Sequence, residues 1–368
     1  HKEYRRQRQM CIRDRAVVTR YERSGASSRM RFYQYLPSLR QAGLEVFTAP
    51  LFSNEYVEGL QSGNRKLWEI FRAYAARLEF FFSLGKIDLL WIENEALPWV
   101  PAKIEQAILG EKVPFVLDYD DAVFHQYDHH ANYLVRLWLG DKHLQLMRRA
   151  ATVVAGNDYI ATYARNAGAS AVEVLPTVVD LLRYPVTSRQ TNKFAPPLVG
   201  WIGQRVTARY LVPLSHVFCH LAQAGIARFS AVGVDAKALG LPMDSKPWSE
   251  ATEVEAIGLF DIGIMPLSDG PFERGKCGYK LIQYMACGLP VVASPVGVNS
   301  QIVEHGVNGF LASTPQEWTQ ALKVLAADRS LRERMGRAGR QKVEQHYSLQ
   351  ATRQRLISLL RESVDNQQ

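Results

Sequence analysis

Short, continuous apolar runs alternate with longer segments of helical periodicity along the first half of the chain. The apolar runs predict strands at 16–19, 44–50, 87–93, 114–120, 151–157 and 171–176. Continuous apolar runs are typical of strands that are buried on both faces, as in parallel sheets. Amphipathic segments such as residues 31–43 lie between the runs and predict helices. The pattern therefore predicts βαβ units that build a parallel sheet covered on both faces.

The same alternation returns in the second half, after a polar break. Residues 184–197 are polar and contain prolines, which is typical of an interdomain linker. A second set of strands is predicted near 198–202, 228–232, 261–266 and 289–294. Residues 315–363 are charged and amphipathic with a helical period. With 368 residues, the chain is long enough for two such α/β domains.

The polar break and the charged ends define the expected domain boundaries. We expect a first domain at 16–183, the linker at 184–197, a second domain at 198–345, and a C-terminal helix at 346–368 that crosses back to the first domain. Residues 1–15 have no apolar period and are interpreted as a non-native tail. The tail carries six basic and two acidic residues, so without it the formal net charge falls from +8 to +4.

Composition and charge narrow the class of protein. The chain is 47% apolar and 22% charged, which is ordinary for a globular protein. Its four cysteines form no C-x-x-C pair, so neither a disulfide framework nor a zinc site is expected, and a cytoplasmic location fits. No apolar run approaches the ~20 residues of a membrane span, and no secretory signal is recognised. The modest positive charge favours diphosphates or an anionic membrane surface as partners, and no nucleic acid is expected.

The stretch from Pro271 to Gly297 carries the strongest chemical signal. Gly275 and Gly278 stand three apart in a loop, with Lys276 between them and Lys280 just inside the following helix. A glycine-rich loop that leads into a helix N-terminus presents free backbone N–H groups, and flanking lysines add positive charge, so this is a candidate anion site. An ordinary αβ unit with a solvated, charged loop is the alternative.

The turn after the first predicted strand is a second candidate. It contains Gly25, Ser27, Ser28 and Arg29, with further arginines at 20, 23 and 31. The serines are placed to cap the next helix, and the glycine allows the loop to tighten. We expect the turn to meet substrate phosphate or acceptor, because ligands bind at the carboxyl ends of strands in such sheets. The alternative is a solvated turn with charged neighbours.

MACGLPVV, residues 285–292, resembles the signature of family 4 glycosyltransferases, whose consensus runs E-x-F-G-x-x-x-x-E-A-M-A-C-G-x-P-V-V. Gly278 falls on the loop glycine of that signature, while Gly275 and Gln283 replace its two glutamates. Further resemblance lies in three other segments, at 174–184, 199–211 and 304–311. The resemblance implies the GT-B fold, an α/β architecture of two Rossmann-like domains whose parallel sheets face each other across a cleft. It also implies a retaining sugar transfer from a nucleotide-sugar.

The resemblance assigns roles to the donor side. The leaving diphosphate must be neutralised, and Arg209, Arg205 and Lys276 are the expected catalytic cations, with surface arginines as the alternative. Gly203, Gly278 and Lys280 would complete the phosphate cradle. Gln283 would hold the ribose hydroxyls, and Glu273 is placed to replace the missing first carboxylate or to be a solvated loop residue. No metal and no other cofactor is expected.

On the acceptor side, Asp120 and Asp121 are expected to meet acceptor hydroxyls, and His125 is a further candidate. Asp118 and Asp120 spell D-x-D, which binds metal in a different glycosyltransferase fold. An Asp-rich turn that caps a helix is the alternative. His216 and His220, four apart, have the spacing of metal ligands but also fit a packing helix.

The segment 65–86 mixes arginines with aromatic residues. It fits either a helix on an anionic membrane, where a lipid-linked acceptor would sit, or a helix packed on the sheet with its arginines outside.

The function expected from all these features is a retaining hexosyltransferase. It would act on a UDP- or GDP-sugar and a saccharide or lipid-linked acceptor, in bacterial surface-polysaccharide synthesis. Its place would be cytoplasmic, with peripheral contact to the inner membrane face. Two alternatives stay open: a non-transferring GT-B enzyme of the nucleotide-sugar epimerase type, which needs acid–base residues in its site, and a catalytically silent nucleotide-sugar-binding protein, which the two replaced glutamates motivate.

Overall fold

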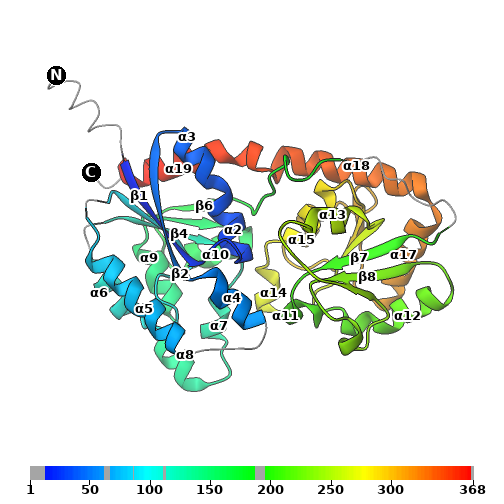
Figure 1. The fold of residues 1–368 in the computed structure, drawn as a ribbon, viewed down its shortest axis with the longest axis horizontal. Coiled ribbons are helices and arrows are strands. Elements are labelled where there is room, and N and C mark those ends of the chain that lie inside the picture. Colours follow the sequence, from blue (N-terminus) through cyan, green and yellow to red (C-terminus); the bar gives the residue numbers. More distant parts are fainter. Residues whose placement is uncertain (1–12, 62–66, 86, 111–112, 187–194, 366–368) are drawn as a thin grey trace. The chain divides into compact units, whose positions relative to one another are not determined.

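The computed structural model describes residues 13–61, 67–85, 87–110, 113–186 and 195–365. The chain divides into two compact units (Figure 1). The first unit extends to Thr177 and regains the chain at Thr352, and the second comprises Val178–Ala351. Each unit holds one six-stranded sheet, and the recorded strand pairs are parallel. The α/β architecture predicted from the apolar runs is therefore confirmed in both halves.

In the first unit the sheet has the order β2-β1-β3-β4-β5-β6. The strands are β1 (Arg13–Tyr21), β2 (Leu44–Phe52), β3 (Leu89–Glu93), β4 (Phe115–Tyr119), β5 (Thr152–Ala155) and β6 (Val172–Val174). The helices are α2 (Ala26–Arg31), α3 (Leu36–Gln41), α4 (Asn54–Gln61), α5 (Leu67–Phe82), α6 (Ala102–Leu109), α7 (His125–Asp128), α8 (Tyr133–Leu139), α9 (Lys142–Arg149), α10 (Asp158–Asn166) and the later part of α19 (Leu349–Asp365). The strand order reverses between β1 and β3, which opens the sheet at their carboxyl ends.

In the second unit the order is β12-β11-β10-β7-β8-β9. The strands are β7 (Leu198–Ile202), β8 (Arg228–Val232), β9 (Asp244–Lys246), β10 (Ile262–Met265), β11 (Val291–Ala293) and β12 (Gly309–Leu311). The helices are α11 (Arg205–Ala208), α12 (Ser215–Gln223), α13 (Glu253–Gly258), α14 (Pro271–Arg274), α15 (Tyr279–Ala286), α16 (Asn299–Ile302), α17 (Pro315–Ala327) and α18 (Arg329–His346). Here the reversal falls between β7 and β10, so the loops after these two strands leave from neighbouring positions on one edge.

Several boundaries differ from those predicted. Strand β1 begins at Arg13, and Arg15 is buried and donates to the carbonyl of Leu360 at 3.3 Å, so the expected tail overlaps the sheet. The chain enters the second unit at Val178, before the expected linker, because Tyr184 is buried in that unit. Residues 187–194 of the linker lie outside the described residues. Among the described helices, none has the length and apolar character needed to cross a membrane.

Candidate functional site

The second unit places two predicted phosphate-binding segments side by side. Strands β7 and β10 pair through Val199 and Ile262, so the loops at their carboxyl ends share an edge of the sheet. The close approach is visible at Gly203, which follows β7. A Cβ at this glycine would meet the Cε of Lys280 at 2.9 Å and the Trp201 ring at 2.6 Å. The Lys280 ammonium in turn lies over the Trp201 ring, 5.6 Å from its centroid. The structure thus brings Gly203 and Lys280 together, as the cradle prediction requires.

Arg209, from the connection after β7, contacts Glu273, from the connection after β10. The guanidinium of Arg209 lies 3.3 Å from a carboxylate oxygen of Glu273, and that oxygen also accepts a hydrogen bond from the Tyr210 hydroxyl. Glu273 is buried, whereas the Arg209 side chain is 61% exposed. An exposed ion pair contributes little to stability, so the contact mainly sets the direction of the guanidinium. Glu273 is therefore a positioning residue in the structure, not the solvated loop glutamate of the alternative.

Lys276 completes the cationic cluster. Its backbone N–H donates to the Glu273 carbonyl at 3.2 Å, and its ammonium lies 4.7 Å from the centroid of the Phe272 ring. Arg209 ends α11 in the connection after β7, Lys276 lies between α14 and α15, and Lys280 lies in the first turn of α15; these three residues are called the cation cluster below. Arg205 opens the short helix α11 and is exposed.

The backbone conformation at position 278 requires a glycine. Its φ is +67° at the N-cap of α15, in the left-handed region that L side chains avoid. A Cβ there would also meet the Cδ1 of Ile302 at 2.4 Å. The helix that follows buries Leu281, Ile282 and Met285, as the apolar stripe predicted. A buried, firmly packed helix fixes its N-terminus, which carries partial positive charge, beside the cation cluster.

Gln283 lies in a different environment from the one expected. Only 3% of it is exposed, and its amide nitrogen donates to the Tyr184 hydroxyl at 2.8 Å. That hydroxyl donates to Glu253 at 3.2 Å, and Glu253 also accepts from Trp248 at 3.1 Å. No motif marks Glu253, so sequence reasoning missed it. A glutamate at 283 would put a second carboxylate against the same hydroxyl, which gives a physical reason for the neutral glutamine.

In the first unit, polar residues gather where β1, β3 and β4 end. The Glu93 carboxylate accepts from the backbone N–H of Arg20 at 2.8 Å and from the Ser28 hydroxyl at 2.6 Å. The Ser27 hydroxyl donates to Asp120. Burial raises the pKa of Glu93 to about 7. Burial and the nearby charge of Asp121 raise the pKa of Asp120 to about 6.

These contacts change the roles expected for the first turn. Helix α2 begins at Ala26 and its N-cap Gly25 receives no side-chain bond, so the predicted serine caps are wrong. Gly25 has an ordinary φ of −72°, but a Cβ would lie 2.5 Å from that of Tyr21. Arg29 is buried, and one of its guanidinium nitrogens donates to the Arg23 carbonyl at 3.3 Å. The glycine serves packing, and the arginine faces the interior instead of a solvated turn.

Asp118 and His125 are held by contacts within the chain, whereas His216 and His220 are exposed. One oxygen of Asp118 accepts from Arg31 at 2.7 Å and the other from the Trp91 indole at 3.2 Å. The two ring nitrogens of His125 contact Asp128 at 2.8 Å and Tyr159 at 2.9 Å. His216 and His220 lie exposed on α12, and in the part of the chain that the structure describes they join no group of three candidate metal ligands.

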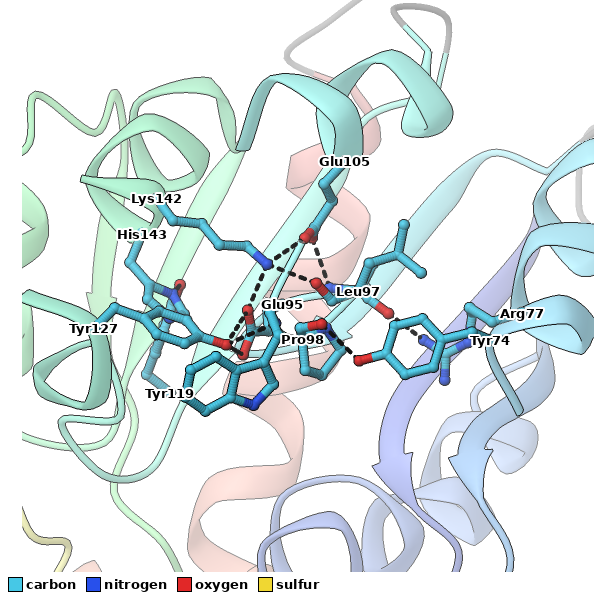
Figure 2. A network of polar contacts seen from close by, with 12 residues as sticks. Tyr74, Arg77, Glu95, Leu97, Pro98, Glu105, Tyr119, Tyr127, Lys142 and His143 are labelled. Carbon is cyan, nitrogen blue, oxygen red and sulfur yellow. Dashed lines mark hydrogen bonds and ion pairs between the residues drawn. The ribbon is translucent and has the colours of Figure 1, made fainter. Parts of the chain in front are cut away.

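A buried polar network next to this edge was not predicted at all (Figure 2). The Lys142 ammonium is fully buried and lies 2.6 Å from Glu95 and 2.8 Å from Glu105. It also donates to the carbonyl of Leu97 at 2.6 Å. The Tyr127 hydroxyl donates to Glu95 at 2.9 Å. The three charged residues are far apart in sequence and belong to no motif, so only the fold brings them together.

The comparisons with known proteins agree with this geometry. Residues 249–328, which include α14, the glycine loop and α15, match the family model described as glycosyl transferases group 1. The match covers that segment of the chain and not its first unit. The matched segment contains Lys276 and Lys280, the two lysines of the cation cluster. A curated relative, the spore coat protein SA of Bacillus subtilis, is 30% identical over 78 residues, which is 20% of this chain and 21% of that protein.

Solved structures are similar in fold to this chain over nearly its whole length. HepE of Anabaena in complex with UDP and glucose matches at a TM-score of 0.67 and 18% identity, over 95% of this chain and 100% of that one. Sucrose-phosphate synthase of Thermosynechococcus elongatus matches at 0.69 and 15%, over 95% and 98%. The α,α-trehalose-phosphate synthase of Burkholderia vietnamiensis matches at 0.63 and 14%, over 96% and 98%. The predicted GT-B fold is therefore confirmed.

Proposed function

We propose that this protein is a retaining glycosyltransferase. It would move a hexosyl group from a nucleotide-diphosphate sugar to a saccharide or lipid-linked acceptor in bacterial surface-polysaccharide synthesis. The observation that carries the proposal is the cation cluster of Arg209, Lys276 and Lys280 beside the N-terminus of α15. Support comes from the group 1 family match across this loop and from the similarity of the fold to a structure that holds UDP and glucose.

The chemistry asks the second unit to stabilise a leaving group. In the transfer, the bond between the anomeric carbon and the diphosphate oxygen breaks, and the acceptor oxygen bonds to the same carbon. The acceptor proton passes to the leaving phosphate, so no nucleophile of the protein is consumed. Negative charge grows on the diphosphate as the bond breaks, and cations placed beforehand stabilise that charge most. Glu273 would hold Arg209 in direction, and Gly203 would let the backbone approach the phosphate.

The first unit would receive the acceptor. Asp120, paired with Ser27, and the adjacent Asp121 stand where β4 ends, with Glu93 at the end of β3. Carboxylates in such a place accept hydrogen bonds from sugar hydroxyls. A lipid-linked acceptor would place the protein at the inner face of a cell membrane, in peripheral contact with it.

The proposal is tested by Arg209→Ala and Lys276→Ala in a transfer assay with a matched donor and acceptor. We expect each variant to lose about a hundredfold or more in kcat/KM, because each removes charge stabilisation from the leaving group. Arg228→Ala is the matched control, since the side chain of this exposed arginine of the same unit donates, among the contacts described, only to the Pro196 carbonyl. Unchanged transfer in both variants would remove the phosphate role of the cation cluster.

One observation favours a second candidate, a catalytically silent nucleotide-sugar-binding protein. Gln283 is occupied within the second unit and Gly275 carries no side chain, so neither glutamate of the family signature has a direct replacement. Nucleotide binding without donor hydrolysis, epimerisation or transfer across an acceptor panel would favour this candidate. A new sugar epimer formed without acceptor would instead indicate an epimerase.

A further inference from the structure

Helix α8 of the first unit exposes an apolar face. Four of its seven residues, Tyr133, Leu134, Leu137 and Trp138, are between 59% and 67% exposed. Residues spaced at i, i+1, i+4 and i+5 lie on one side of a helix. The helix is held by its ends, since Asn132 caps it by accepting from the Leu134 N–H at 2.9 Å and Leu139 is buried. Large contiguous apolar surface of this kind is typical of a site that another molecule covers.

Trp99 extends this surface in an unusual conformation. It is 51% exposed and has a φ of +60°, which is costly for any residue with a side chain. Its ring lies 5.1 Å from that of Tyr127 and 6.0 Å from that of His130. His130 in turn borders α8, because its carbonyl accepts from Arg136. Trp99 therefore continues the apolar face of α8 across the 127–130 turn.

Residues of the buried network drawn in Figure 2, Tyr127 above all, hold the backbone at Trp99. The backbone N–H of Trp99 donates to the Tyr127 hydroxyl at 2.9 Å, and Tyr127 is tied to Glu95. Lys142 holds the carbonyl of Leu97, two residues before Trp99. A strained residue persists only where its surroundings fix it, and such residues cluster at functional sites. The buried charges of the network thus hold the exposed Trp99 in one fixed position.

Helix α5 adds the third part of the surface. The Tyr74 hydroxyl donates to the carbonyl of Pro98, next to Trp99. One and two turns before Tyr74, Phe71 and Leu67 are 70% and 72% exposed, and Trp68 is 73% exposed. Since residues three and four apart share a helix face, Leu67, Phe71 and Tyr74 form one stripe that leads to Trp99. The alternative of a helix packed on the sheet with its arginines outside does not hold for all of α5, because Arg77 is buried while Leu67 and Phe71 are exposed.

We propose that α8, Trp99 and the first half of α5 form a docking surface for an anionic lipid bilayer. This inference deepens the proposed function, on which it rests for the membrane-borne acceptor. The surface is rich in tryptophan and tyrosine, which concentrate at membrane interfaces. Its exposed arginines, Arg72 and Arg136, match anionic headgroups. Helix α8 has no acidic residue, and the first half of α5 has one, Glu69. The positive formal net charge, +8 for the whole chain and +4 without residues 1–15, acts in the same direction.

The test is vesicle flotation of the full chain, without nucleotide or acceptor. Vesicles of phosphatidylcholine with an equal share of phosphatidylglycerol are compared with vesicles of phosphatidylcholine alone. The triple variant Leu134→Ser, Leu137→Ser, Trp138→Ser removes the apolar face of α8. Trp99→Ser removes the exposed tryptophan that extends this face. Leu182→Ser is the matched control, because Leu182 is 87% exposed on the second unit. Circular dichroism of each variant reports its folding. The nucleotide-dependent thermal shift reports whether the second unit still binds nucleotide.

We expect the wild-type chain to float with the anionic vesicles. The triple variant should bind at least about tenfold more weakly and Trp99→Ser several-fold more weakly, while Leu182→Ser binds as the wild type. The proposal is overturned if the wild type does not float, or if the triple variant floats equally well. It is also overturned if the surface instead joins two copies, seen as a dimer that the triple variant converts to monomer without any vesicle binding. If flotation fails while nucleotides still shift the melting temperature, the membrane proposal fails and the proposed function stands.

Discussion

Replacing Lys142 by methionine tests whether the buried network supports the first unit as described. The Lys142 ammonium is fully buried between Glu95 and Glu105, at 2.6 and 2.8 Å. Removing one member of a buried ion pair leaves an uncompensated charge and costs about 3–5 kcal/mol in the free energy of unfolding. For a unit of this size that cost lowers the melting temperature by roughly 10 °C. Methionine fills a similar volume, so the loss reports charge more than packing.

The pH dependence sharpens this prediction. Burial opposes ionisation of Glu95, but Lys142 and then His143 outweigh it and lower its pKa. A lowered carboxyl pKa contributes stability that is present at neutral pH and lost as pH falls through the native pKa. Without Lys142, burial dominates and raises the pKa of Glu95, so the variant should lose stability as pH rises. The difference between variant and wild type should therefore be larger at pH 8 than at pH 5.

The assay is urea unfolding at pH 5 and pH 8, followed by circular dichroism. Arg355→Met is the matched control, since Arg355 pairs with Glu173 at 2.6 Å but both side chains are about half exposed. Such a pair contributes less than about 1 kcal/mol. A Lys142→Met cost below about 1 kcal/mol at pH 8, or one that does not change with pH, would refute the account of the network.

Three further predictions concern single positions. The pKa of Glu93 is raised to about 7, so between pH 5 and pH 8 the native state holds a proton that the unfolded chain has lost, and the wild type should lose about 3 kcal/mol of stability over this range. Glu93→Gln should remove this loss. Unfolding measured as a function of pH tests this, and the same pH dependence in variant and wild type contradicts it. Gly278→Ala should lower the free energy of unfolding by about 2–4 kcal/mol, because of its φ of +67° and the contact with Ile302. Gly258→Ala, with open space at its Cβ, should be neutral or stabilising in the same thermal unfolding assay. Equal effects of the two substitutions would contradict the close packing at Gly278. Gln283→Glu should cost about 1–3 kcal/mol at neutral pH and less at pH 5, because two carboxylates would then compete for the Tyr184 hydroxyl; a stabilised variant would show that the buried contact with Glu253 is misassigned.

The fold was predictable because most strands are continuous apolar runs. Strands β9 and β12, each three residues long, were missed, whereas β2 and β6, which lie at the edges of the other sheet, were predicted from their apolar residues. β9 reads Asp-Ser-Lys and is largely exposed, so it carries no apolar signal. β12 starts with Gly309, whose Cβ would lie 2.4 Å from the Val291 carbonyl oxygen. Such short strands are fixed by their backbone partner, so periodicity does not find them.

The site was predictable only where its residues are close in sequence. The glycine loop and its lysines form one segment, so their pattern indicates a candidate anion site from the sequence alone. The pairing of Arg209 with Glu273 joins residues 64 positions apart. The burial of Gln283 against Tyr184 and the network of Lys142 likewise depend on contacts between distant segments. A sequence pattern indicates which side chains are available, but burial and long-range partners decide which of them face a ligand.

The central claim is that the cation cluster binds the diphosphate of a nucleotide-sugar. The most direct measurement is a thermal-shift screen of the full chain with nucleoside diphosphates and nucleotide-sugars, repeated on Lys276→Ala. The account predicts a reproducible rise in melting temperature with one nucleoside diphosphate and its sugar conjugate, which falls strongly in the variant. No shift with any nucleotide, or an equal shift in Lys276→Ala, would contradict it.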